Sequence, residues 1–514
     1  MFLKLIASVL GTLGAYALYE IFKAIYAELN SSARNLRGPK SAHWFYGNLK
    51  ELLDDQASGL EERWFEQYGR TMKIHRLFVM ITFAPSSLTR RPMFHKGVLV
   101  VEGDVHKQQR RILNPAFGAP QVRELTSIFV DTSIQLRDIW ATQAAKAGGV
   151  ARVEILSWLS KATLDIIGLA GFNYRINALG TESHEAPDEL AEAFATVFAS
   201  SSGSRALNML KFLVPAIHYI PTREAKIVRK AQETMMRIGA KLLAAAKRET
   251  VENGTFSTGH GRDLLTLLVR ANTSKDIPES QRLSDEAVIA QVPTFLVAGH
   301  ETTSTAVTWA LFALTQNMAV QTRLRKELLN VPTDHPTMDE LNSLPYLECV
   351  VKETHRLYAP VPAVVRMATR DDIVPLGAPV TDTDGTVHES LRVRKGDQFR
   401  IPIAAVNRDA KIWGPDAMEF VPERWEAATP ISNAIPGMWG NQLTFLGSSR
   451  GCIGFRFSLV ETKALLFTLI RGFEFELAVP KEDIGKKGNA IVLRPIVLSD
   501  CAAGNQLPLL VRPV

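Results

Sequence analysis

The sequence predicts a mostly α-helical fold with small β-sheets. Apolar residues recur at helical spacing over long stretches, among them residues 60–68, 122–145 and 284–316. Short strand-like runs gather in the last third of the chain, at residues 391–393, 398–403, 473–477, 491–498 and 507–511. No internal repeat and no sharp change of composition divides the 514 residues beyond the first forty. We therefore expect one large domain, residues 45–514.

An apolar run opens the chain, from Phe2 to Ile25, and only Lys4, Glu20 and Lys23 interrupt it with charge. Its length is near the roughly 20 residues that a membrane-spanning helix needs. The alternative is a cleavable signal peptide, but the run exceeds a typical signal core and no small-x-small cleavage site follows. We therefore predict a single-pass membrane anchor at residues 1–28 and a polar linker at residues 29–44.

Charge on the two sides of this anchor predicts its orientation. Lys4 alone precedes the centre of the apolar run, whereas Lys23, Arg34, Arg37 and Lys40 follow it. Basic residues prefer the cytosolic side of a membrane, so the large domain is expected in the cytosol. Only three cysteines occur in the chain, too few for a disulfide framework, which agrees with a reducing compartment.

The net charge of +6 is small for a surface of this size, and no block of five or more like charges occurs. Nucleic acid is therefore not an expected partner. Basic residues do gather between Arg90 and Arg111. This cluster predicts either a docking face for an acidic protein or anionic lipid, or a solvated basic face.

A glycine-rich stretch around Cys452 reads F-L-G-S-S-R-G-C-I-G, from Phe445 to Gly454. Glycine permits a large group to approach the backbone closely. Arg450 and the start of the helix expected from Phe455 offer positive charge to the sulfur, which favours a thiolate. The alternative is that Cys452 is only a small buried apolar residue.

A second motif, A-G-H-E-T-T-S at Ala298 to Ser304, lies within the long helix expected at residues 284–316. Glycine and hydroxyl side chains inside a helix favour a local opening of its hydrogen bonds. Such a groove would be lined by an acid, Glu301, and an alcohol, Thr302. A zinc protease motif would need a second histidine where Ser304 stands, so zinc is excluded.

Two further pairs have helical spacing. Glu353 and Arg356 are three residues apart among apolar neighbours, which indicates a buried ion pair; a buried pair usually needs a third partner. His106 and Arg110 are four apart, hence on one helical face, and both can donate to a carboxylate. An exposed ion pair and a merely basic surface helix are the alternatives.

Together these stretches resemble the cytochrome P450 family, in the order in which that family carries them. Phe445, Arg450, Cys452 and Gly454 match its cysteine pocket, whereas Ser448 stands where the family usually has glycine. The resemblance is strongest to fungal microsomal members. It implies the cytochrome P450 fold behind a single N-terminal transmembrane helix.

The resemblance also implies the cofactor and the roles of the site residues. The cofactor would be haem b, iron protoporphyrin IX, without a covalent link, and Cys452 would be the metal ligand. Its pocket would include Phe445 and Arg450, with His106 and Arg110 on one propionate and Arg366 on the other. Glu301 and Thr302 would relay protons during oxygen activation. Glu353, Arg356 and Arg424, the last within Pro422–Trp425, would form a structural triad.

The function implied by the resemblance is a monooxygenase that hydroxylates a lipophilic substrate, such as a terpenoid or other secondary metabolite. No dinucleotide fingerprint or flavin domain is evident, so electrons would come from NADPH through a separate NADPH–cytochrome P450 reductase, with cytochrome b5 as a second donor. The location would be the endoplasmic reticulum membrane. Two alternatives stay open: a haem-thiolate isomerase or dehydratase, and a non-enzymatic membrane haem sensor or lipid carrier.

Overall fold

A computed structural model describes most of the chain: single positions and short runs between residues 8 and 52, then residues 59–75, 96–182, 188–199, 223–252, 263–275, 277–426, 435–488 and 492–514. The expected anchor at residues 1–28 therefore lies largely outside the described residues. Its described positions are helical and exposed. The anchor and the linker stay predictions.

Helices make up most of the described structure. They are α3 (Leu60–Tyr68), α5 (Gly103–Leu113), α6 (Ala119–Lys146), α7 (Ile155–Phe172), α8 (Glu189–Ala199), α10 (Arg223–Glu252), α11 (Leu264–Thr273), α12 (Asp285–Ile289), α13 (Gln291–Thr315), α14 (Met318–Leu329), α15 (Met338–Asn342), α16 (Pro345–Leu357), α17 (Ile403–Val406), α18 (Ala410–Trp413) and α19 (Phe455–Gly472). The predicted fold class, mostly helical with small sheets, is confirmed.

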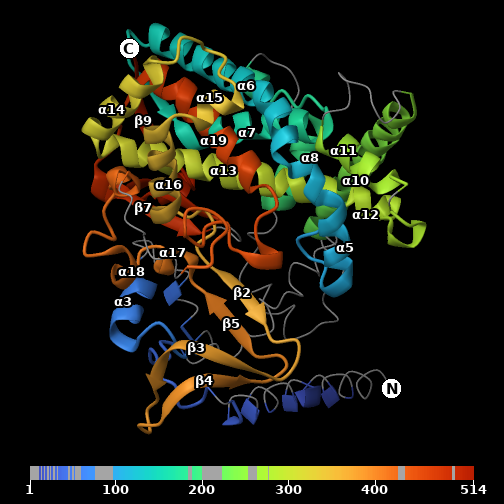
Figure 1. The fold of residues 1–514 in the computed structure, drawn as a ribbon, viewed down its shortest axis with the longest axis vertical. Helices are drawn as coiled ribbons and strands as arrows, with labels where there is room; N and C mark the ends of the chain where they lie inside the picture. The colour runs from blue at the N-terminus through green and yellow to red at the C-terminus, as the bar shows by residue number, and fades with distance from the viewer. Residues whose placement is uncertain are drawn as a thin grey trace.

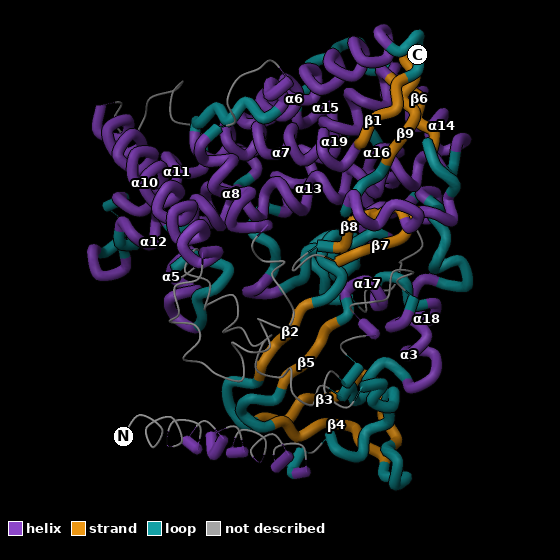
Figure 2. The backbone as a smooth tube through the Cα atoms, turned by 180° about the vertical axis from the view of Figure 1, so that it is seen from behind, coloured by secondary structure: helices purple, strands orange, loops and turns teal. Residues whose placement is uncertain are grey.

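In the described part of the chain, the strands form four small antiparallel sheets. They are β1 (Ala151–Glu154), β2 (Val364–Met367), β3 (Asp372–Thr381), β4 (Val387–Val393), β5 (Gln398–Ile401), β6 (Phe473–Leu477), β7 (Ile484–Gly488), β8 (Leu493–Val497) and β9 (Pro508–Pro513). The sheets have the orders β1-β9-β6, β2-β5, β3-β4 and β7-β8. Figures 1 and 2 show β2–β5 and β3–β4 together at the end of the molecule away from the C-terminus.

The helical part is built around α13, which runs through its middle and packs on α7 and α19 (Figure 1). Most of α13 and most of α7 is buried, because both are apolar around most of their circumference. Among the described residues, α7 is the helix long and apolar enough to cross a membrane, but two thirds of it is buried in the protein. It is therefore a core helix.

The expected helix over residues 284–316 is interrupted at Ala290, between α12 and α13. Ser284 caps α12 as predicted, accepting a hydrogen bond from the backbone N–H of Ala287 at 3.3 Å. The break has a local cause, because Pro293 has no N–H to donate to the carbonyl four residues earlier, at Ile289.

Candidate active site

The loop that carries Cys452 is closed by its own backbone. The Cys452 N–H donates to the Phe445 carbonyl at 2.9 Å, and the Met438 N–H donates to the Leu446 carbonyl at 2.9 Å. A Cβ on Gly447 would lie 2.1 Å from the Pro436 carbonyl oxygen, so only glycine fits there. The loop therefore holds Cys452 at a defined position at the start of α19.

Two residues of this loop have left-handed backbone: Leu446 with φ +56° and Ser448 with φ +61°. This region favours glycine, because a Cβ there crowds the backbone. Ser448, which replaces the usual glycine of the family, therefore keeps the turn at a cost in strain. Its side chain is exposed to solvent.

Cys452 itself is surrounded by protein and yet exposed to solvent, so space remains beside its sulfur. Burial is the largest effect on the thiol and raises its pKa, while the Gly454 N–H and the charge of Arg110 lower it in part. The surroundings alone therefore do not favour the anion, and the thiolate stays a prediction. A metal ion bound to the sulfur would remove the proton outright, so the site fits a metal ligand.

Basic side chains from two further segments lie beside the cysteine loop and near its Arg450: His106 and Arg110 from α5, and Arg366 from β2. Of these, Arg110 acts on the Cys452 sulfur itself. Burial lowers the pKa of His106, and Arg450 and Arg110 lower it further. Burial and the charge of Arg450 likewise lower the pKa of Arg110 and of Arg366. The groups are thus close enough to repel one another.

Hydrogen bonds fix these basic groups at the rim of the loop. Arg110 Nη1 donates to the Gly451 carbonyl at 3.0 Å, next to Cys452, and Arg366 Nη1 donates to the Val365 carbonyl at 3.1 Å. Arg450 pairs with Glu102 and donates to the Val101 carbonyl at 3.3 Å.

Three guanidinium groups lie here, those of Arg110, Arg366 and Arg450. Among the described residues that act on them, one carboxylate, that of Glu102, opposes their charge, which leaves a surplus of two positive charges. Such a surplus favours the binding of an anion. The two propionates of haem carry two negative charges. A thiol with space beside it and a two-charge surplus nearby therefore fit haem.

One face of α13 is open. Ala298 is exposed and Gly299 and Thr302 are partly exposed, although most of the helix is buried. Ala298 and Thr302 are four apart and share a helical face, and their small side chains leave room for a ligand. Gly299 instead lies against Ile167 of α7. The Thr302 hydroxyl donates to the Ala298 carbonyl at 2.7 Å, so the local hydrogen-bond competition expected here is present.

Glu301 does not share this face with Thr302. Its carboxylate forms an ion pair with Arg494 of β8, and His300 Nε2 lies 3.6 Å from it. The structure thus does not bring the predicted acid and alcohol side by side, because adjacent helical residues point in different directions. Arg494 was missed from the sequence, since nothing local signals a contact between residues so far apart.

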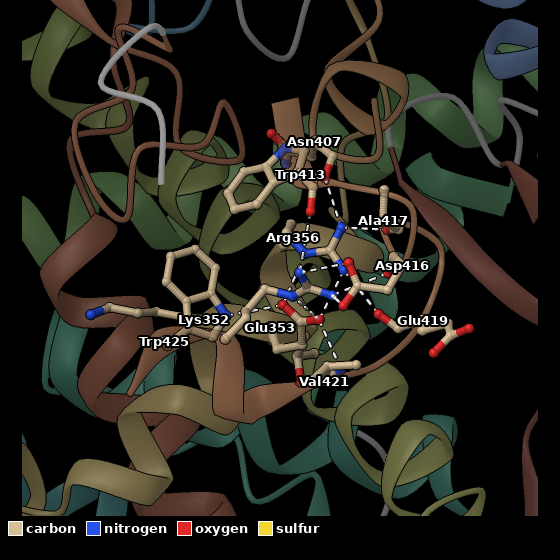
Figure 3. A network of polar contacts seen from close by, with 12 residues as sticks. Lys352, Glu353, Arg356, Asn407, Trp413, Asp416, Ala417, Glu419, Val421 and Trp425 are labelled. Carbon is tan, nitrogen blue, oxygen red and sulfur yellow. Dashed lines mark hydrogen bonds and ion pairs between the residues drawn. The ribbon is translucent and has the colours of Figure 1, made fainter. Parts of the chain in front are cut away.

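The predicted triad of Glu353, Arg356 and Arg424 is brought together, because both arginines form ion pairs with Glu353. Figure 3 shows Glu353 and Arg356 within this network. Arg356 donates from Nε and Nη2 to the two Glu353 oxygens, both at 2.8 Å, and both side chains are fully buried. Arg424 Nε donates to Glu353 Oε1 at 2.9 Å, and the Trp425 indole N–H donates to Oε2 at 2.9 Å. The buried carboxylate is therefore fully hydrogen-bonded.

Asn407 and Thr444 join this triad to the cysteine loop. Arg356 Nη1 donates to the Asn407 carbonyl at 3.1 Å, and the Asn407 side chain accepts from the Leu443 N–H and donates to the Thr444 hydroxyl, both at 2.8 Å. Thr444 in turn donates to the His355 carbonyl at 2.7 Å. Sequence reasoning missed both residues, because neither belongs to a charged motif.

Phe445, predicted as part of the cofactor pocket, is buried in an aromatic cluster. Its ring centroid lies 5.3 Å from that of His355, 5.7 Å from that of Trp439 and 6.2 Å from that of Phe455. The ring thus anchors the start of the cysteine loop, while its carbonyl accepts the Cys452 N–H.

Comparison with known proteins identifies the family. The cytochrome P450 family model matches residues 82–498. The chain is 47% identical to cytochrome P450 monooxygenase 205 of Postia placenta, with 98% of each protein covered. It is 32% identical to cytochrome P450 monooxygenase claP of Ampulloclitocybe clavipes, with 93% of each covered. The chain therefore belongs to the cytochrome P450 family.

These matches confirm the predicted family and the predicted enzyme class, a cytochrome P450 monooxygenase. Membership implies a haem-thiolate cofactor, a redox partner and a small-molecule substrate. The roles of individual residues rest on the geometry above.

Proposed function

We propose that this protein inserts one oxygen atom of O2 into a lipophilic substrate, with haem b held by Cys452. When bound, the haem supplies the reductive activation of dioxygen. The observation that carries the proposal is the cluster of His106, Arg110, Arg366 and Arg450 beside the loop of a solvent-exposed cysteine on which Arg110 acts.

The basic residues divide the binding of the two propionates between them. His106 and Arg110 lie on one face of α5, so they bind one propionate together, and Arg366 binds the other. Burial lowers the pKa of His106, which favours the neutral ring, and a neutral ring still donates through one N–H. Arg450 supports the loop through Val101 and Glu102 and adds positive charge.

Glu301 and Thr302 have separate tasks in this proposal. Thr302 presents its hydroxyl on the open face of α13, where oxygen and substrate would lie. Glu301 lies on the neighbouring face and is paired with Arg494. Its carboxyl group relays protons toward the Thr302 hydroxyl. The triad of Glu353, Arg356 and Arg424 holds the cysteine loop through Asn407.

Electrons come from NADPH through a separate NADPH–cytochrome P450 reductase, with cytochrome b5 as a second donor. The basic α5 supports this, since Lys107 and Arg111 are exposed on the same helix that carries Arg110. Residues 1–28 anchor the protein in the endoplasmic reticulum membrane, residues 29–44 are the linker, and the catalytic domain, residues 45–514, is cytosolic. The substrate is a terpenoid or another secondary metabolite.

The test is expression of the full chain with a reductase. The reduced protein should form a carbon monoxide complex with the red-shifted absorption of thiolate ligation, and Cys452→Ser should lose it. Cells that express the chain and the reductase, with NADPH as the electron source, are supplied with labelled dioxygen and a panel of terpenes, sterols and aromatics. They should release a product with one labelled oxygen.

Two outcomes would overturn the proposal. Product formed without NADPH and reductase, or without label, would indicate an isomerase or dehydratase. Full function of Cys452→Ser, or a wild-type protein without the thiolate spectrum, would indicate a non-enzymatic haem sensor or lipid carrier.

A further inference from the structure

Glu461 is a buried acid to which the proposed function assigns no task. It lies on α19, the helix that follows Cys452, and is fully buried. Neither of its carboxyl oxygens accepts a hydrogen bond of good geometry from the described part of the chain. An ionised carboxylate in such surroundings is very costly, so the group holds its proton. Burial indeed raises the pKa of Glu461 well above its ordinary value.

A neutral carboxyl group has one O–H donor, which needs an acceptor. The Thr303 hydroxyl of α13 is close enough to act on the Glu461 carboxyl, where it offsets part of the effect of burial. Thr303 Oγ1 also lies 3.1 Å from Ser458 Oγ of α19. The Thr303 oxygen can accept a hydrogen bond from the Glu461 carboxyl group while the Thr303 and Ser458 hydroxyls keep the hydrogen bond between them.

The side chains of Thr303, Ser458 and Glu461 lie between α13, which carries Thr302, and α19, which follows Cys452. Thr303 follows Thr302, whose hydroxyl lies on the open face of α13. Ser458 and Glu461 are three residues apart on α19, hence on one face. Most other described residues at this point of α13 and α19 are buried, and Thr305 and Thr462 are further buried polar residues among them.

We propose that Glu461 is a positioning residue of the active site: its protonated carboxyl donates to Thr303, and the Thr303–Ser458 pair then fixes α13 relative to α19. This sets where the Thr302 hydroxyl stands relative to the Cys452 sulfur. The inference rests on the proposed function, because it assigns Thr302 and Cys452 to one reaction. It explains why a polar group that would destabilise the core is kept there.

Three variants of the full-length, haem-loaded protein test this. Glu461→Gln keeps the shape and a neutral donor, Glu461→Leu removes the donor, and Thr462→Val removes the neighbouring buried hydroxyl of α19, which also lacks a partner in the described structure. Product formed per NADPH should fall about fivefold in Glu461→Leu, the effect of one neutral hydrogen bond. It should stay within about twofold in Glu461→Gln, and Thr462→Val should equal the wild type.

Thermal midpoints separate this role from a structural one. Replacing a buried carboxyl group that accepts no hydrogen bond with leucine should leave the midpoint unchanged or raise it, although the coupling of NADPH to product falls. If Glu461→Leu does not fold, Thr303→Val breaks the same link from α13 and should lower coupling to the same degree.

Normal coupling in a folded Glu461→Leu protein, or a Glu461→Gln protein as impaired as the leucine variant, would overturn the inference. A wild-type protein without the thiolate spectrum would instead overturn the proposed function.

Discussion

Replacement of Ser448 by glycine tests how the cysteine loop is held. Ser448 has φ +61°, a conformation that costs a residue with a Cβ about 1–2 kcal/mol and glycine almost nothing. Glycine also gains freedom in the unfolded chain, which takes back about 0.4–1 kcal/mol. Ser448→Gly should therefore stabilise the protein by about 0.5–1 kcal/mol. For a chain of this length, that corresponds to a rise of about 0.5–1 °C in the thermal midpoint.

Ser448→Ala separates backbone strain from the hydroxyl group. Alanine keeps the Cβ and hence the strain, but lacks the hydroxyl. Because the Ser448 side chain is exposed, neither variant should change the haem reduction potential or the carbon monoxide spectrum. The assay is differential scanning fluorimetry of the holoprotein together with potentiometry. A lower midpoint in Ser448→Gly would refute the strain argument, and a shifted potential in Ser448→Ala would show that the hydroxyl tunes the thiolate.

Three other substitutions have definite expected outcomes. Glu353→Gln leaves Arg356, which has no exposed side-chain surface, without its buried counter-ion; this should cost about 3–5 kcal/mol and lower both the thermal midpoint and the yield of haem-loaded protein. Burial lowers the pKa of His355 to about 4 from an ordinary 6.5. As the pH falls, His355 is therefore protonated in the unfolded protein before it is protonated in the folded protein. Stability is then lost between pH 6.5 and 4, and His355→Phe should remove up to about 3 kcal/mol of that loss, as measured from thermal midpoints across this range. Glu301→Gln should lower product formation about 100-fold while the carbon monoxide complex stays normal.

Each of these has a control or a contradicting result. Glu419→Gln changes an exposed carboxyl group in the same region and should alter stability by less than about 0.5 kcal/mol. A Glu353→Gln protein as stable as this control would contradict the role of the triad. Parallel pH profiles for wild type and His355→Phe would show that another group causes the acid sensitivity. Unchanged turnover in Glu301→Gln would exclude it as the proton donor.

Much of the site could be predicted because its chemistry is local. Phe445 to Gly454 form one closed loop whose hydrogen bonds join residues within it, such as the Cys452 N–H and the Phe445 carbonyl. Glu353 and Arg356 pair because a helix places residues three apart side by side. Helical spacing likewise predicted α3 with its bounds and α6 to within three residues at either end.

Other elements could not be predicted because their partners lie far along the chain. Strand β1 was missed, since Ala151 to Glu154 are short and become a strand only by pairing with β9 at the C-terminus. Strand β3 was missed because Pro375 and Pro379 interrupt a run that is mostly exposed. Its pairing with β4 is irregular between Pro375 and Val380.

Residue types at short spacings were enough to predict the family, the cysteine that would hold the iron and the order of the motifs. Which charges meet could be known only from the folded chain. It placed Arg494 on Glu301, set Arg110 against the Gly451 carbonyl, and left Glu461 buried beside Thr303. Packing between distant segments creates these contacts, and burial then determines which of the groups keep a charge.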